Sequence, residues 1–231
     1  MVIDFEPWHQ LLGGYVTPKG QVDYQRWKGD VDASAQLQDW LVSLQATELS
    51  AMPQNTQLAL LINLYNALTI NQVLGKFPID SVRPSIMGVP NLASFKLFFS
   101  KPVYQLGVQK LSLDGIEHDL LRRQFSEPRI HFALVCASIS CPQLRNEAYR
   151  PETISQQLDD AAQQFMNDPE KNRYDGANNI LYCSKIFQWY ENDFLSESRS
   201  IVEYFQKYSQ QQISADAAIE YLPYDWRLNK L

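Results

Sequence analysis

The sequence has few cysteines and no long apolar run, and each shortage excludes a class of protein. Three cysteines in 231 residues are an odd number that does not make a disulfide framework, and reduced thiols fit a cytoplasmic location. No window reaches the roughly 18 uninterrupted apolar residues of a membrane span. The opening MVIDFEPWHQ has neither the basic nor the apolar region of a secretion signal. We therefore expect a cytoplasmic protein with no membrane partner.

Basic residues are also in deficit. Lys and Arg total 20 against 26 Asp and Glu, a net charge of -6, which gives no general reason to approach a phosphate backbone. Nucleic acid is therefore not an expected partner. Hydrophobic residues make up 45% of the chain, which is typical of a globular protein, and no stretch has the composition of a linker or a repeat. We expect one domain over residues 1–231.

Apolar periodicity predicts an α+β fold, a helix-rich single domain with a small, mainly antiparallel sheet. Helices are expected at 33–44, 54–76, 111–125 and 151–166, with more helix after residue 187. The segment 54–76 is apolar on nearly every side and should be a central, buried helix. Strands are expected at 95–100, on both sides of a turn within 102–113, at 127–136 and at 178–184, and 127–136 is the strongest candidate. The apolar tail 218–231 should dock on the core.

Two amides, Asn63 and Asn66, are three residues apart on the predicted central helix, so they share one flank of it. Buried amides need hydrogen-bond partners. One interpretation is that they tie the helix to the backbone of a neighbouring loop or strand. The other is that one of them faces a pocket, where it orients a histidine or stabilises an oxyanion.

A carboxylate is expected on the apolar face of the helix at 111–125. At 100° per residue Glu117 projects from the same face as its leucines and isoleucine, and His118 lies at the border of that face. Buried carboxyl groups must be paired or protonated and are over-represented at functional sites. The alternative is a glutamate that caps backbone donors beside an exposed histidine.

Within the predicted strand at 127–136, Arg129 and His131 share a face. The histidine is either a structural residue or, together with the guanidinium donors of Arg129, part of a face that accepts an anion.

Two cysteines, Cys136 and Cys141, enclose four residues, a wider spacing than zinc sites use, and no second metal-binding pair follows. Pro142 suits the first position of a helix, which would place Cys141 at the helix N-cap, where backbone donors lower a thiol pKa. A disulfide in an oxidising compartment and inert packing remain alternatives. Cys183 lies in an apolar strand and should be a small buried hydrophobe.

Several blocks, including LINLYNALTI, LSLDGIEHDLLR, PRIHFALVCASISCPQLR and the terminal YDWRLN, resemble the family called domain of unknown function 547. The resemblance spans nearly the whole chain, is most specific over 129–145, and implies that its polar positions form one shared site. The residues that match the family pattern are Asn63, Tyr65, Asn66, Glu117, His118, Arg129, His131, Phe132, Cys136, Ser140, Cys141, Pro142, Arg145, Trp189, Tyr190, Asp193 and Phe194.

The leading hypothesis is a thiol-dependent hydrolase or acyltransferase, with Cys141 as nucleophile, Cys136 in reserve and His118 as the base. Glu117, Asn63 or Asn66 would orient the imidazole or bind the oxyanion. The residues expected to bind substrate, an unknown small molecule or peptide, are Asn63, Asn66, Arg129, His131 and Arg145.

His118 precedes Cys141, so any relation to the papain fold would require a permuted arrangement. No cofactor is expected. One rival hypothesis is a non-enzymatic binding or scaffold module with a buried polar network. Another is a protein that binds metal through Glu117, His118 and His131.

Overall fold

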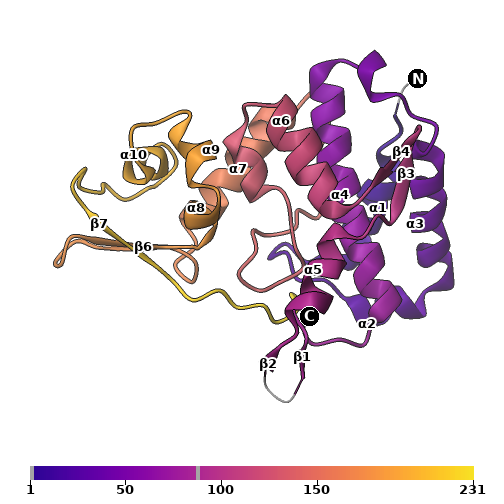
Figure 1. The fold of residues 1–231 in the computed structure, drawn as a ribbon, viewed down its shortest axis with the longest axis horizontal. Coiled ribbons are helices and arrows are strands. Elements are labelled where there is room, and N and C mark those ends of the chain that lie inside the picture. The colour runs from indigo at the N-terminus through magenta and orange to yellow at the C-terminus, as the bar shows by residue number, and fades with distance from the viewer. Residues whose placement is uncertain (1–2, 87–88) are drawn as a thin grey trace.

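The computed structural model describes residues 3–86 and 89–231. Helices dominate its N-terminal part (Figure 1). They are α1 (Glu6–Tyr15), α2 (Tyr24–Gly29), α3 (Val31–Leu44), the short 3-10 helix η1 (Leu49–Ala51) and α4 (Gln54–Lys76). The helices predicted at 33–44 and 54–76 are confirmed.

Helix α4 is the central helix of the larger core. It is buried on all sides over most of its length, from Leu58 to Ile70. By length and hydropathy it could cross a membrane, but 83% of its most apolar window is buried inside the protein. That burial is the pattern of a core helix, as its all-round apolar sequence predicts.

The middle of the chain is made of short elements. They are β1 (Ser85–Ile86), β2 (Val89–Pro90), α5 (Leu92–Ser100), β3 (Tyr104–Leu106), β4 (Gln109–Leu111), η2 (Gly115–Leu121), α6 (Arg122–Gln124) and η3 (Pro128–Phe132). Strands β3 and β4 pair antiparallel, with Tyr104 opposite Leu111, so the predicted turn within 102–113 is confirmed. The helix predicted at 111–125 is present as η2 and α6.

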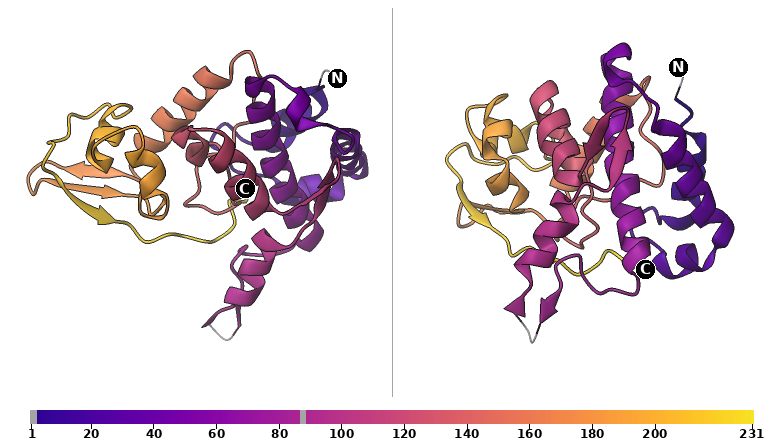
Figure 2. Two further views of the ribbon diagram at one scale, coloured as in Figure 1. Left: turned by 45° about the horizontal axis from the view of Figure 1, so that its top comes forward. Right: turned by 45° about the vertical axis from the view of Figure 1, so that its right-hand side comes forward.

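The strand predicted at 95–100 is wrong, because these residues belong to helix α5. The side chain of Asn91 accepts a hydrogen bond from the backbone N–H of Ser94 at 3.1 Å and caps the helix. A short apolar run does not separate strand from helix by periodicity. Helix α5 and the β1–β2 pair project from the rest of the molecule (Figure 2).

The strand predicted at 127–136 is also wrong. Residues Pro128–Phe132 form the 3-10 helix η3, and the side chain of Glu127 accepts a hydrogen bond from the N–H of Arg129 at 3.2 Å. The following backbone has no strand partner. Its carbonyl at Ala133 and its N–H at Val135 instead bond to the side chain of Asn66, each at 2.9 Å. An amide on α4 thus replaces the neighbouring strand.

The C-terminal part contains the second core. Its elements are α7 (Ile154–Met166), β5 (Arg173–Asp175), β6 (Ile180–Cys183), α8 (Ile186–Trp189), α9 (Glu191–Leu195), α10 (Ile201–Gln206) and β7 (Ala218–Tyr221). Strand β6 pairs antiparallel with β5 and parallel with β7, so the fold is the predicted helix-rich α+β class. The predicted helix at 151–166 and strand at 178–184 are confirmed. Cys183 is fully buried, and burial raises its pKa to about 12.

The buried hydrophobic residues form two clusters, and the C-terminal tail connects them. The larger cluster combines α1 to α4 with residues up to Leu158, and the smaller one is centred on α7 to α10. After β7 the chain runs back to the larger cluster (Figures 1 and 2), where Leu228 is 3% exposed. Tyr224 packs against both clusters. The predicted docking of the tail is confirmed.

Candidate functional site

A cavity of about 500 Å³ lies where residues of the two clusters meet. Its inner end is lined by buried or half-buried polar residues: Glu117, His118, His131, Cys136 and Cys141. Aromatic side chains from α5, α8 and the tail line the rest. The cavity therefore brings together both predicted cysteines and both histidines of the predicted site.

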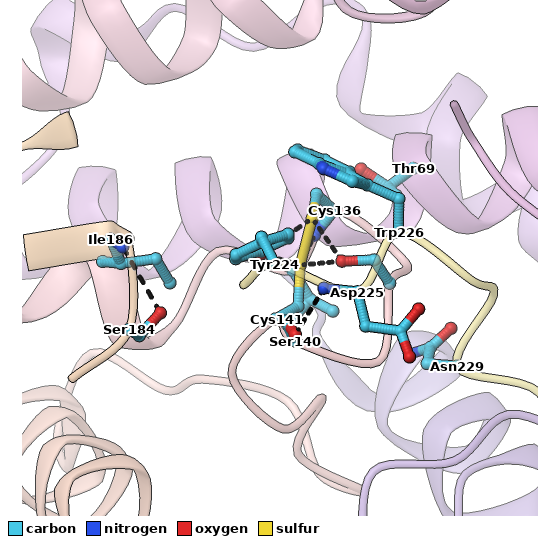
Figure 3. The surroundings of a disulfide bond; sticks show 12 residues. Thr69, Cys136, Ser140, Cys141, Ser184, Ile186, Tyr224, Asp225, Trp226 and Asn229 are labelled. Carbon is cyan, nitrogen blue, oxygen red and sulfur yellow. Dashed lines mark hydrogen bonds between the residues drawn. A yellow bond between two sulfur atoms is a disulfide. The ribbon is translucent and has the colours of Figure 1, made fainter. Parts of the chain in front are cut away.

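The two cysteines are joined in a disulfide, with their Cα atoms 6.2 Å apart. Three donors lie within hydrogen-bond distance of the Cys141 sulfur: the backbone N–H of Cys136 at 3.0 Å and the hydroxyls of Ser138 and Tyr224, each at 3.3 Å. The same two hydroxyls lie 3.2 and 3.5 Å from the Cys136 sulfur, so only the backbone N–H is specific to Cys141. Figure 3 shows the disulfide with the tail residues beside it. Cys141 is 3% exposed and Cys136 is half-buried, so Cys136 is the more exposed residue of the pair.

Burial, with a smaller contribution from the charge of Glu117, raises the pKa of Tyr224 far enough to keep its hydroxyl protonated. A protonated phenol can donate to a sulfur. The tail therefore supplies a stable donor to the cysteine pair.

The tail also fixes the backbone of the cysteine loop. The N–H of Ile139 donates to the carbonyl of Arg227 at 2.8 Å, and the N–H of Asp225 donates to the hydroxyl of Ser140 at 2.8 Å. Ala137 has a φ of 61°, a left-handed conformation that costs a non-glycine residue about 1 kcal/mol or more. No helix begins at Pro142, since the next one starts at Ile154. The predicted helix N-cap at Cys141 is therefore wrong, and side chains and loop backbone supply the donors instead.

Glu117 and His118 lie in a π-helical segment, η2. Such segments are uncommon and are frequently found at functional sites. Glu117 is 7% exposed, as its place on the apolar face predicted, and it lines the cavity. Its hydrogen bond and charge, after the larger effect of burial, raise the pKa of Tyr190. The buried carboxylate therefore has a phenol as partner.

The two histidines are connected through Arg122 and Asp193. The Nη1 of Arg122 lies 3.0 Å from the Nδ1 of His118, and the guanidinium also pairs with both oxygens of Asp193, at 2.6 and 2.8 Å. The Nε2 of His131 lies 2.7 Å from Asp193. This chain of contacts joins η2 and α6 to η3 and α9.

These contacts fix the tautomers of both rings. A guanidinium has only donors, so the Nδ1 of His118 accepts and its Nε2 carries the proton. A carboxylate accepts, so the Nε2 of His131 carries the proton and, in the neutral ring, its Nδ1 is the acceptor. His118 is thus arranged to donate a hydrogen bond, and His131 is arranged to accept a proton.

Burial alone would raise the pKa of Asp193, but hydrogen bonds from Arg122 and His131 outweigh it and hold the pKa well below its usual range. Asp193 is therefore ionised at neutral pH and holds His131, whose side chain is 1% exposed. The ring also stacks on Tyr190 with centroids 3.8 Å apart, so its orientation is fixed from two sides.

The amides Asn63 and Asn66 do not line the cavity. Asn63 bonds to the backbone of Tyr149, donating to its carbonyl at 2.7 Å and accepting from its N–H at 3.0 Å. Asn66 does the same for Ala133 and Val135. Of the two predicted interpretations, the structure shows the one in which the amides tie the central helix to a neighbouring backbone. Asn66 thereby positions the residues directly before Cys136.

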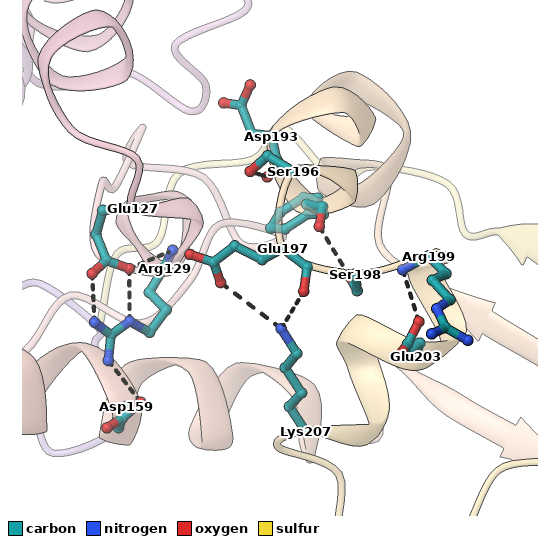
Figure 4. Close-up of polar contacts among 11 residues, drawn as sticks. Glu127, Arg129, Asp159, Asp193, Ser196, Glu197, Ser198, Arg199, Glu203 and Lys207 are labelled. Carbon is teal, nitrogen blue, oxygen red and sulfur yellow. Dashed lines mark hydrogen bonds and ion pairs between the residues drawn. The ribbon is translucent and has the colours of Figure 1, made fainter.

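The arginines Arg129 and Arg145 also lie away from the cavity. Arg129 pairs with Glu127 and with Asp159 at 2.8 Å, which ties η3 to α7 (Figure 4). Arg145 pairs with Glu147 and contacts the carbonyl of Gln157 at 3.4 Å. Of the residues predicted to bind substrate, His131 alone lines the cavity.

The residues of the described ranges include no group of three or more His, Cys, Asp or Glu side chains arranged to hold a metal ion. Arg122 occupies the Nδ1 of His118, and a guanidinium repels a cation. The structure therefore gives no support to a metal site at Glu117, His118 and His131.

Sequence reasoning missed several residues at the cavity. Arg122 follows His118 by four residues, a spacing at which helical side chains meet, so this contact could have been predicted. Asp193 and Tyr190 match the family pattern, but no role was predicted for either residue from the sequence. Tyr224 and Trp226 reach the cavity from a tail that is more than 80 residues away in the chain, and no local pattern predicts such a contact.

Fold and site together define a helix-rich α+β protein with a cysteine pair and two histidines at one cavity. The family described as "Protein of unknown function, DUF547" matches residues 49–166, and the chain belongs to this family. The matched region holds Glu117, His118, His131 and both cavity cysteines, while α8, α9 and the tail lie outside it. No curated protein and no solved structure matches the chain.

Proposed function

We propose that the protein is a thiol-dependent hydrolase or acyltransferase whose nucleophile is Cys141 in the reduced state. The observation that carries the proposal is the backbone N–H of Cys136 at 3.0 Å from the Cys141 sulfur, together with two hydroxyls that lie within 3.5 Å of both sulfurs at the inner end of a cavity. Hydrogen bonds to a thiolate favour the charged form, which is the nucleophile. If the Cys141 sulfur took part in no reaction, these donors would have no role in chemistry.

The disulfide must first be reduced to two thiols, because a disulfide sulfur is not a nucleophile. A dithiol or a phosphine supplies the two electrons. In the cytoplasm, the predicted location, the cellular thiol pool would keep the pair reduced. Cys136 remains the reserve nucleophile because it is the more exposed residue of the pair.

In this proposal the two histidines have separate tasks, which we choose on the basis of their tautomers. His131, held by Asp193, accepts the thiol proton at Nδ1. The Cys141 sulfur then attacks a carbonyl, the leaving alcohol or amine takes the proton from His131, and a thioester remains that water or another acceptor cleaves. His118 donates from Nε2 to the oxygen that gains charge. His131 is thus the base, the role predicted for His118 from the sequence, and His118 binds the substrate, the role predicted for His131.

Reduced protein mixed with p-nitrophenyl acetate should release nitrophenolate in a burst of about one equivalent per chain, because a thioester forms faster than it is cleaved. Mass spectrometry should place the acetyl group on Cys141. We expect Cys141→Ser to lose the burst and His131→Gln to slow it about 100-fold, a typical loss for a general base.

The variant Cys183→Ala is the matched control, because Cys183 is a buried thiol outside the cavity, and it should keep the burst. The oxidised protein should show none. Acetylation of lysines alone, or a burst that survives in Cys141→Ser, would refute the proposal.

A binding or scaffold module is the second candidate. It is favoured by the network from His118 through Arg122 and Asp193 to His131, in which each group has a hydrogen-bond partner. Satisfied polar networks fix a fold without any reaction. This candidate predicts no thioester in the reduced protein.

A further inference from the structure

A continuous aromatic wall runs from Tyr224, beside the cysteine pair, to the outer part of the cavity. Trp226 lies 4.7 Å from Phe95, 5.8 Å from Trp189 and 4.5 Å from Tyr224, measured between ring centroids. Helix α5, helix α8 and the tail each contribute to it. Trp189 is 45% exposed, which is unusual for so large an apolar side chain. The wall has the composition of a small-molecule site, and 500 Å³ is a volume typical of one.

Two cations line the same outer part, Arg83 and Lys96. The Arg83 guanidinium carbon lies 5.8 Å from the ring centroids of both Phe95 and Trp226, and its Nε is buried without a hydrogen-bond partner among the described residues. No ion pair joins either cation to a carboxylate anywhere in residues 3–86 and 89–231. Buried donors are normally satisfied, so the Nε of Arg83 lacks an acceptor within the part of the chain that the structure describes.

The charge is reversed toward the inner end. Asp114 and Glu117 line the cavity there. Burial raises the pKa of Asp114, and the charge of Glu117 adds to the rise, while His118 and the charge of Lys96 oppose it. An anion is therefore disfavoured beside these carboxyl groups and favoured at Arg83, whereas Lys96 lies close enough to Asp114 for its charge to act on both the carboxyl group and a bound anion. His118 presents a donor that suits a neutral carbonyl.

We infer that the cavity binds organic carboxylates that have an aromatic or apolar body. The body of the ligand lies against the aromatic wall. Its carboxylate accepts hydrogen bonds from Arg83 and is attracted by the positive charge of Lys96. A carbonyl at the far end of the ligand reaches His118 and the cysteine pair. That last element rests on the proposed function, whereas binding of the anion does not.

Calorimetric titration with 1-naphthaleneacetate and its neutral amide tests the inference. The protein is the full chain as the double variant Cys136→Ser/Cys141→Ser, which has no cavity thiol. We expect the carboxylate to bind at least about tenfold more tightly than the amide. Arg83→Gln should remove most of that preference, and Lys96→Gln should reduce it. Added salt should also weaken the preference, because the outer part of the cavity is partly exposed.

Arg123→Gln is the matched control, because Arg123 is 75% exposed and lies outside the cavity. It should leave the preference unchanged. Lys96 is exposed on α5, so its variant tests the inference even if Arg83→Gln does not fold. Equal binding of acid and amide, binding of neither, or a preference that persists in both variants would overturn the inference. Because no thiol is present, failure here is distinct from failure of the thioester experiment.

Discussion

Replacing Asn66 with alanine should lower the free energy of unfolding by about 3 kcal/mol. The amide is 3% exposed and bonds to two buried backbone groups, the carbonyl of Ala133 and the N–H of Val135. Each buried group that is left without a partner costs about 1–3 kcal/mol. Among the described residues, no strand pairs with this backbone to replace the lost bonds. Urea unfolding of the variant and the wild type measures the difference.

Two controls separate the effect of Asn66 from that of any amide on α4. Asn71 makes one exposed contact, with Gln38, so Asn71→Ala should change stability by less than about 0.5 kcal/mol. Asn63 holds the backbone of Tyr149 in the same two-bond manner, so Asn63→Ala should be about as unstable as Asn66→Ala. Only Asn66 holds the backbone that comes directly before the cysteine loop. Only its variant should therefore change the alkylation rate of the reduced cysteines under native conditions, and equal changes in both would contradict this account.

Replacing Asp193 with asparagine should lower stability at pH 7 by about 2 kcal/mol and make stability less sensitive to acid. The carboxylate pairs with Arg122 and His131, with its side chain 24% exposed, and hydrogen bonds to ionised groups contribute about 1.5–3 kcal/mol. An amide has a single acceptor oxygen and turns its own donors toward those of the arginine.

The sign of the pH effect follows from the lowered pKa of Asp193 in the folded state. A depressed folded pKa stabilises the fold fully above the unfolded value of about 3.9, and this contribution is lost as the pH falls below it. Unfolding at pH 7, 5 and 3 should thus show a steeper acid loss in the wild type than in Asp193→Asn. Parallel pH curves would show that Asp193 is not held as the structure indicates.

Local patterns predicted the elements that depend on local residues. The apolar residues of 54–76 cover every side of the helix, and this pattern predicted both the helix and its central burial. The helical spacing of residues 111–125 placed Glu117 on the buried face. The strand at 127–136 failed because alternation alone does not supply a partner strand. Its backbone partner is a side chain, Asn66, and no periodicity reports such a replacement.

The site was predicted only in part, again because local patterns report residues that are close in the sequence. The cysteines, His118, His131 and Glu117 are close in sequence and do line one cavity. The aromatic wall and the donor Tyr224 come from α5, α8 and the tail, which meet only after the chain has folded. Arg129 was assigned to substrate from its guanidinium donors and Arg145 from its match to the family pattern, but acidic neighbours on α7 or beside it pair with them.

The most direct test of the central claim is the alkylation of the reduced, native protein by iodoacetamide at several pH values, with mass spectrometry to identify the modified cysteine. The account predicts rapid modification of a cavity cysteine, with a pH midpoint below the value of about 8.5 for a free thiol, and slower modification in Tyr224→Phe, which removes one donor to the sulfur. Cys183 should stay unmodified because it is fully buried. If Cys136 and Cys141 also stay unmodified until the protein unfolds, neither is an activated nucleophile and the claim is refuted.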